Sequence, residues 1–194
     1  QEVNAAMGVI VAAPTAGGAG TLPAVLTVLA KSKGLPADKL IAALATAGLI
    51  GAVIAERASL SGAEGGCQAE TGAGAAMAAG ASTEMLGGTP SQVGHAVALT
   101  MQGMLGLVCD PLGGLVELPC VFRNATGAAI ALAGIEMALA GIKFAIPADE
   151  VIDVMGEIGR EMDVRYRETA GGGLAATPTG RKLAKERLYQ IRRS

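Results

Sequence analysis

Long apolar stretches alternate along the chain with short clusters of proline, glycine and charged residues, a pattern typical of helices joined by turns. Several stretches begin at a proline, which the first position of a helix tolerates because its N–H group would be unpaired there. The clearest start is Thr89-Pro90-Ser91-Gln92, where the threonine can cap the helix and the glutamine can reach back. Strands have little support beyond the apolar run Val9-Ile10-Val11. The pattern predicts an all-α protein with helices over residues 24–32, 36–58, 89–107, 123–140, 147–162 and from 177 to the end.

The amino-acid composition indicates how these helices pack against one another. Hydrophobic residues make up 51% of the 194 residues but aromatic residues only 2%, and 29 residues are glycine. A glycine inside a helix costs about 0.5–1 kcal/mol relative to alanine, so tight helix contacts are needed to offset the loss. We therefore predict a compact bundle of Gly/Ala-rich helices that forms a single domain over residues 1–194. The segment from Glu2 to Met7 reads like the middle of a helix, so we expect the domain to be truncated at its N-terminus.

Charge and cysteine content narrow the functional classes. The net charge is −2 and the isoelectric point about 5.5, which gives no positive excess to hold a phosphate backbone, so we expect no nucleic-acid partner. Three cysteines are too few, and odd in number, for a secreted disulfide framework. With no basic and apolar leader in the sequence, we expect a cytoplasmic protein.

A membrane protein is the alternative that the uncharged stretches raise. Residues 3–30 contain no charge, and neither does the stretch from Met85 to Cys109. A spanning helix needs an unbroken hydrogen-bond ladder, whereas proline and glycine interrupt the first stretch at Pro14 to Pro23 and the second at Gly87 to Pro90. We therefore expect no membrane association.

The three cysteines are candidate metal ligands. Cys67 follows two glycines, Cys109 precedes Asp110-Pro111, and Cys120 follows Pro119, so each stands at a loop or helix end. Their separations of 42 and 11 residues match neither a zinc ribbon nor a ferredoxin. Spacing alone leaves two interpretations open, a metal site and three buried core thiols.

Other polar features have two interpretations as well. The glycine-rich segment from Pro14 to Gly20 precedes a helix and can present N–H groups to a carboxylate, or it is simply a tight turn. His95, the only histidine, is either a general base or a packed helix residue. Glu64, Glu70 and Glu117 flank the cysteines and either orient a substrate amine or are solvated loop charges.

Five segments, in order along nearly the whole chain, resemble one family. They are Glu2-Val-Asn-Ala-Ala-Met-Gly-Val-Ile-Val-Ala-Ala-Pro-Thr-Ala-Gly, Ser61-Gly-Ala-Glu-Gly-Gly-Cys-Gln-Ala-Glu, Gly106-Leu-Val-Cys-Asp-Pro, Glu117-Leu-Pro-Cys-Val-Phe-Arg-Asn-Ala and Gly172-Gly-Leu-Ala-Ala-Thr-Pro-Thr-Gly-Arg. The chain is similar to the alpha chain, or alpha domain, of the iron–sulfur-dependent L-serine dehydratases. The resemblance implies a [4Fe-4S] cluster held on loops by Cys67, Cys109 and Cys120. One departure is Gly18, where the family often has serine.

The resemblance also implies the reaction and its partners. L-serine would lose water and then ammonia to give pyruvate, at the iron that three thiolates leave without a protein ligand. For the substrate carboxylate we expect Thr15, Ala16, Gly17 and Gly18, or Arg123 and Asn124 beside Cys120. The resemblance implies a beta chain or beta domain as partner, and we expect an oligomer. His95 has apolar neighbours on its helix, so we expect the catalytic base to come from the beta part.

Two other classes of protein remain as alternatives at this point. One is an iron–sulfur protein for electron transfer or redox sensing, whose cluster would be fully ligated. The other is a helical membrane or scaffold protein without a cofactor, which would bind no iron.

Overall fold

A computed structural model describes residues 1–191, with side chains as far as residue 186. The prediction of an all-α fold is confirmed: within that range the only β pairing is an isolated bridge between Cys109 and Arg167. The α-helices are α1 (Glu2–Ala5), α2 (Thr21–Ser32), α3 (Ala37–Arg57), α4 (Gly62–Gly65), α5 (Ala73–Met85), α6 (Pro90–Gln102), α7 (Cys120–Leu139), α8 (Ala148–Glu161) and α9 (Pro178–Ile191). Shorter turns are the π-helix η1 (Gln68–Gly72) and the 3-10 helices η2 (Leu112–Gly114), η3 (Val164–Tyr166) and η4 (Gly173–Ala176).

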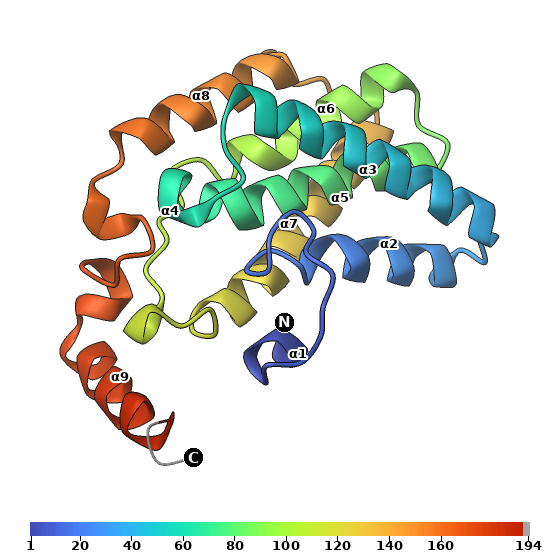
Figure 1. Cartoon of the computed structure of the whole chain (residues 1–194). Coiled ribbons are helices and arrows are strands. Elements are labelled where there is room, and N and C mark those ends of the chain that lie inside the picture. Colours follow the sequence, from blue (N-terminus) through green and yellow to red (C-terminus); the bar gives the residue numbers. More distant parts are fainter. Residues whose placement is uncertain (192–194) are drawn as a thin grey trace.

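Helix α5 is the centre of the bundle, and α2, α3, α6 and α7 pack around it (Figure 1). Twelve of its 13 residues are buried, and most are alanine or glycine. These small side chains let neighbouring helices come close: a Cβ on Gly80 would overlap side chains of α3 and α6, Ile50 and Val97. A Cβ on Gly51 of α3 would lie 2.9 Å from Cε of Met77. The glycine content thus serves the close packing that the composition predicts.

The sequence pattern does not predict α4, η1 or α5. No helix was predicted between residues 58 and 89, because α5 is buried on all sides and shows no apolar face in its sequence. The run Val9-Ile10-Val11 forms no strand, and Val9 is 97% exposed.

Predicted helix starts are largely confirmed, with small shifts. Thr89 and Gln92 form the capping box of α6 as predicted, with the Gln92 N–H donating to Thr89 Oγ1 at 3.3 Å. Pro36 is the N-cap of α3 and not its first residue. Helix α2 starts at Thr21, ahead of Pro23, because the side chain of Asn124 on α7 fixes that end.

Two helix ends near the cysteines differ from the prediction. Helix α6 ends at Gln102 and not at residue 107, since Gly103 caps it and Gly106 has a φ of +80°. Helix α7 begins at Cys120, three residues earlier than predicted. The first difference adds residues to the irregular segment that carries Cys109, and the second places Cys120 at the first position of α7.

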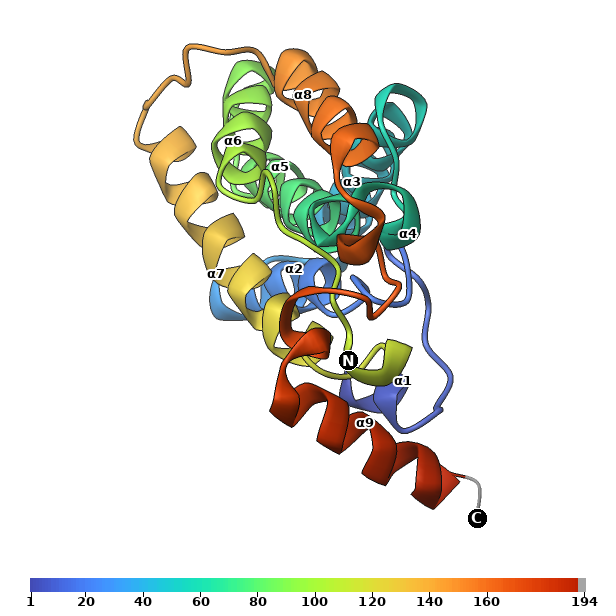
Figure 2. The same cartoon turned by 90° about the vertical axis from the view of Figure 1, so that its left-hand side faces the viewer.

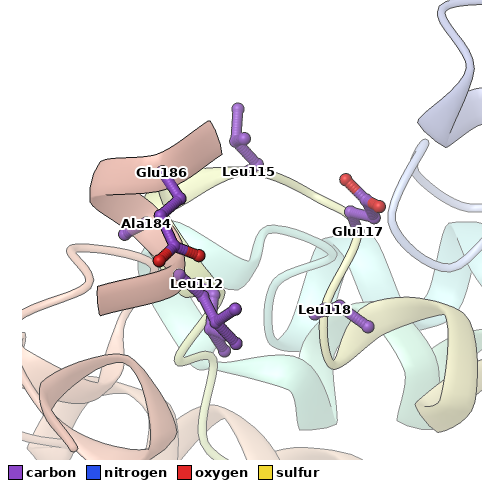
Figure 3. A pocket seen from close by; sticks show the side chains of 7 residues that line it. Leu112, Leu115, Glu117, Leu118, Ala184 and Glu186 are labelled. Carbon is purple, nitrogen blue, oxygen red and sulfur yellow. The ribbon is translucent and has the colours of Figure 1, made fainter. Parts of the chain in front are cut away.

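Helix α9 lies at one end of the molecule, away from the bundle (Figures 1 and 2). It packs against η2 and η4, and the last predicted helical residues, 192–194, lie outside the described part. Between α9 and the segment around η2 is a cavity of about 140 Å³ lined by four leucines, Ala184 and two glutamates. In Figure 3, Glu117 and Glu186 lie on opposite sides of this cavity.

Within the described residues, one helix, α3, is long and apolar enough to cross a membrane by length and composition. Its inner face, with Ala43, Ala47, Gly51 and Ile54, packs on α5. The expectation that the protein has no membrane association stays a prediction.

Candidate metal centre

Three thiols from separate segments come together at the end of the bundle. Cys67 lies between α4 and η1, Cys109 in the loop after α6, and Cys120 is the first residue of α7. Each is at most 3% exposed, and none forms a disulfide. The cysteines therefore stand at loops and helix ends, as the sequence predicts.

Two of the thiols form a tight group with a carboxylate. The sulfurs of Cys67 and Cys109 and a carboxylate oxygen of Glu70 lie within 4.8 Å of one another. A Cβ on Gly62 would lie 3.1 Å from the Cys109 sulfur and 3.0 Å from Glu70 Oε2, so a larger residue there would crowd both groups. Thiolate and carboxylate groups are ligands for transition metals. Cys120 lies outside this group.

The side chain of Gln68 fixes the π-helix η1, which contains Glu70 and begins directly after Cys67. It is fully buried; Oε1 accepts from the Gly106 N–H at 2.9 Å and Nε2 donates to the Met155 carbonyl at 3.0 Å. The Gln68 N–H donates to the Leu107 carbonyl at 3.0 Å. Such π-turns occur frequently at functional sites, and here one ties Cys67 to the loop that carries Cys109.

Cys109 is held by the segment after η3. Its N–H donates to the Tyr166 carbonyl at 2.8 Å, and its carbonyl accepts from the Glu168 N–H at 2.8 Å. Next to it, Asp110 accepts from the Leu174 N–H at 2.6 Å. Through these hydrogen bonds, residues 166–174 hold Cys109 and Asp110 in position.

Arg123 of α7 is the cation of the centre. Its Nη1 lies 2.7 Å from Asp110 Oδ1, donates to the Val108 carbonyl at 2.8 Å and contacts the Cys67 sulfur at 3.6 Å. Its side chain is 16% exposed and also lines a cavity of about 360 Å³ beside the end of α6. Arg123 thus both contacts the Cys67 sulfur and lines an open cavity.

The three thiols differ in acidity. The hydrogen bond with Cys109 lowers the pKa of the Cys67 thiol, and Arg123 adds to the effect, while burial opposes it. The same hydrogen bond, together with burial, raises the pKa of Cys109. Burial and the charge of Cys67 raise the pKa of Cys120 to about 12. Cys67 is therefore the most acidic of the three thiols, and a bound cation would favour ionisation of all three.

Glu70 joins the glycine-rich segment to the thiols. Its Oε1 accepts from Thr15 Oγ1 at 2.8 Å. A Cβ on Gly17 would lie 2.6 Å from Glu70 Oε2, and one on Gly18 would lie 2.8 Å from the Glu70 carbonyl oxygen. Burial raises the pKa of Glu70. The two glycines let the segment lie directly on this carboxyl group.

Asn124 holds the other side of the same segment. Its Nδ2 donates to the Gly17 carbonyl at 2.7 Å and to the Cys120 carbonyl at 2.9 Å. Its Oδ1 accepts from the Gly20 N–H at 3.0 Å and from Thr21 Oγ1 at 3.2 Å. One buried side chain thus fixes the glycine-rich segment to the helix that begins at Cys120.

A family model described as serine dehydratase alpha chain matches residues 1–175. The chain belongs to this family. It is 56% identical over 185 residues to a probable L-serine dehydratase alpha chain of Bacillus subtilis, covering 95% of this chain and 62% of the relative. It is 54% identical over 179 residues to one of Latilactobacillus sakei, covering 92% and 86%. It is 49% identical over 189 residues to the L-serine dehydratase alpha chain of Peptoniphilus asaccharolyticus, covering 97% and 65%.

The structure brings most of the predicted site residues of this alpha chain together. Thr15, Gly17 and Gly18 meet Glu70, while Arg123 and Asn124 contact Cys67 and the Cys120 backbone. Their roles as ligands for substrate or metal stay predictions.

Two predicted residues lie outside that arrangement. Ala16 is exposed, and its carbonyl accepts from Gln1 Nε2 at 2.8 Å. His95 is half-buried on α6, and no hydrogen bond or ion pair joins its side chain to a described residue.

Sequence reasoning gave too little weight to three residues. In the sequence, Glu70 stands out only by its place beside a cysteine, and Gln68 and Asp110 do not stand out. All three are at most 8% exposed. Their place within three positions of a cysteine is the only signal in the sequence, and Glu64 shares it although it is exposed and accepts from Ser59 at 2.6 Å, so their burial had to come from the structure.

Proposed function

We propose that Cys67, Cys109 and Cys120 hold a [4Fe-4S] cluster and that the chain is the cluster-carrying part of an L-serine dehydratase. The observation that carries the proposal is the meeting of the buried thiols of Cys67 and Cys109 beside Arg123, with the buried Cys120 close enough to feel the charges of Cys67 and Arg123. The donor set suits the group because soft thiolates are the usual ligands of iron–sulfur clusters. Three thiolates would leave one iron of a four-iron cubane without a protein ligand, and that iron would act as a Lewis acid toward the leaving hydroxyl.

The overall reaction is removal of water and then ammonia from L-serine. A proton leaves Cα and hydroxide leaves Cβ, which gives aminoacrylate. This product tautomerises to an imine, and water then releases pyruvate and ammonia. The chain's own residues bind and orient the zwitterion during the first step.

Arg123 binds the substrate carboxylate in this proposal. Its Nη1 is used by Asp110, Val108 and Cys67, while no described residue accepts from its Nη2. A guanidinium held on one nitrogen offers the other in a fixed direction, which suits a carboxylate. The cavity of about 360 Å³ beside Arg123 gives the substrate a place to enter.

Glu70 faces the substrate ammonium group in the same proposal. A carboxyl held by Thr15 and lying against Gly17 and Gly62 is fixed in position beside the thiols. The glycine-rich segment packs against this carboxyl, and Glu70 is only 8% exposed. Asn124 keeps that segment in place and contacts no substrate, because the protein satisfies both polar atoms of its side chain.

The general base comes from the beta part. A base must reach the Cα proton within hydrogen-bond distance, and His95 lies on α6 without a contact to the three thiols. We expect the alpha chain to act in the cytoplasm, with the beta chain and in an oligomer.

The test is a serine dehydration assay with the cluster rebuilt under anaerobic conditions. The chain alone is expected to be nearly inactive, and addition of the beta part is expected to restore pyruvate formation. His95→Ala should leave the restored rate close to that of the parent. A full rate from the chain alone, lost on His95→Ala, would make His95 the base. A cluster that cycles reversibly between redox states and ignores serine would favour electron transfer.

A further inference from the structure

A second cavity lies beside the cysteine-bearing segments. It measures about 330 Å³ and is enclosed by α4, the start of η1, α8 and the segment after η3. The residues that matter for its chemistry are Ser59, Glu64, Gly65, Gly156, Arg160 and Arg167. None of these residues has a role in the proposed dehydration.

Two arginines of this cavity lack the acidic partner that three other described arginines have. Arg57, Arg123 and Arg165 each pair with an aspartate. In the described part of the chain, no carboxylate lies within ion-pair distance of Arg160 or Arg167. The Nε of Arg167 is buried and has no hydrogen-bond acceptor. A buried donor without an acceptor is costly, so an anion bound in the cavity would satisfy it.

Glycines of α8 and α4 form part of the cavity wall near Arg160. A Cβ on Gly156 would lie 3.3 Å from Arg160 Nη1, so the guanidinium of Arg160 folds over this glycine. A Cβ on Gly159 would lie 2.9 Å from the Gly65 Cα, so α8 and α4 touch there. The small residues thus leave room above α8 and set Arg160 along its edge.

The charge of the lining selects the anion. The carboxylate of Glu64 accepts from Ser59 Oγ at 2.6 Å and lines the same cavity. Two guanidiniums and one carboxylate leave one net positive charge, which suits a monoanion better than a phosphate dianion. Guanidinium groups bind carboxylates through paired hydrogen bonds.

We propose that this cavity is a binding site for a small carboxylate, separate from the site of dehydration. The ligand is a 2-oxo acid or an α-amino acid, whose shared chemistry is the carboxylate beside Cα. Arg167 forms the β-bridge with Cys109, and Gly65 lies two residues before Cys67. A ligand bound in this cavity therefore contacts residues that adjoin two of the three thiol-bearing segments.

The test is titration of the chain with sodium pyruvate and, separately, with L-alanine, followed by amide NMR at Gly65, Gly156 and Gly159. Saturable shifts at these glycines are expected with at least one of the two ligands. Arg160→Gln should raise the dissociation constant roughly tenfold through loss of a charge-assisted bond. Arg165→Gln is the matched control, because Arg165 is exposed and pairs with Asp163. It should change the constant less than about twofold, since exposed charges act weakly.

A further variant distinguishes the two sources of the carboxylate. Glu64→Gln should tighten pyruvate binding by removing a like charge, and should weaken alanine binding if the ammonium group uses Glu64. No saturable shift with either ligand, an equal loss in Arg160→Gln and Arg165→Gln, or tighter binding of inorganic phosphate would overturn the proposal. The measurement needs neither a cluster nor the beta part, so its failure leaves the proposed dehydration untouched.

Discussion

Replacing Asn124 with alanine should destabilise the chain markedly, although this residue touches neither metal nor substrate in our account. Asn124 is 5% exposed and makes four side-chain hydrogen bonds. The Cys120 carbonyl belongs to a helix, and Thr21 Oγ1 also donates to the Asn124 carbonyl at 3.1 Å, so both keep partners after the change. The Gly17 carbonyl and the Gly20 N–H lose theirs.

The magnitude follows from these two groups. Gly17 is buried and Gly20 half-buried, and a buried polar group left without a partner costs about 1–3 kcal/mol, so the two losses together are expected to be about 3 kcal/mol. For a chain of this size that corresponds to a fall in Tm of about 6–12 °C. Thr126→Ala is the control, because this exposed threonine bonds only within α7 and should change stability by less than about 0.5 kcal/mol.

The assay is urea unfolding followed by far-ultraviolet circular dichroism, with the free energy taken from the midpoint and slope. A loss of less than about 1 kcal/mol for Asn124→Ala would refute the reasoning, which requires orphaned groups at Gly17 and Gly20. A similar loss in Thr126→Ala would show that the effect belongs to α7 in general.

Three further outcomes are expected. Arg123→Gln should raise the pKa of the Cys67 thiol, since Arg123 lowers it, and the alkylation rate of the reduced, metal-free chain should then rise at higher pH. Burial raises the pKa of Glu70 in the folded chain above its unfolded value of about 4.3. The free energy of unfolding therefore falls as pH rises from the unfolded pKa through the folded one. Glu70→Gln should flatten this slope in urea unfolding of the metal-free chain. Gly134→Ala should cost about 1–3 kcal/mol because its Cβ overlaps a hydroxyl of α6, whereas Gly48→Ala, in open space, should stabilise by about 0.5–1 kcal/mol.

Helix boundaries with local signals were predictable from the sequence, and the central helix was not. Thr89 and Gln92 cap each other through neighbouring residues, so their signal is contained in four positions. Helix α5 has neither a cap with a side-chain hydrogen bond nor an apolar face, because neighbours bury it on all sides. Helix α2 starts at Thr21 through Asn124, a contact across 103 residues that no local pattern reveals.

The candidate site was predictable in its residue types but not in its arrangement. Cys67, Cys109 and Cys120 were recognised through the family resemblance, since their spacing fits no common metal motif. The two roles that needed the structure belong to Glu70 and Asn124. Glu70 is close to Thr15 only because η1 packs under the glycine-rich segment. Asn124 positions that segment, a role that depends on which polar atoms the fold has already satisfied.

Iron and sulfide analysis after anaerobic reconstitution tests the central claim most directly. The chain is expected to bind about four irons, and Cys67→Ser, Cys109→Ser and Cys120→Ser should each fail to hold a stable cluster. Thr126→Ala, on the exposed side of α7, should keep the parent's iron content. A full cluster in any one of the three cysteine variants, or a parent chain that binds no iron, would contradict the assignment of these thiols as the ligand set.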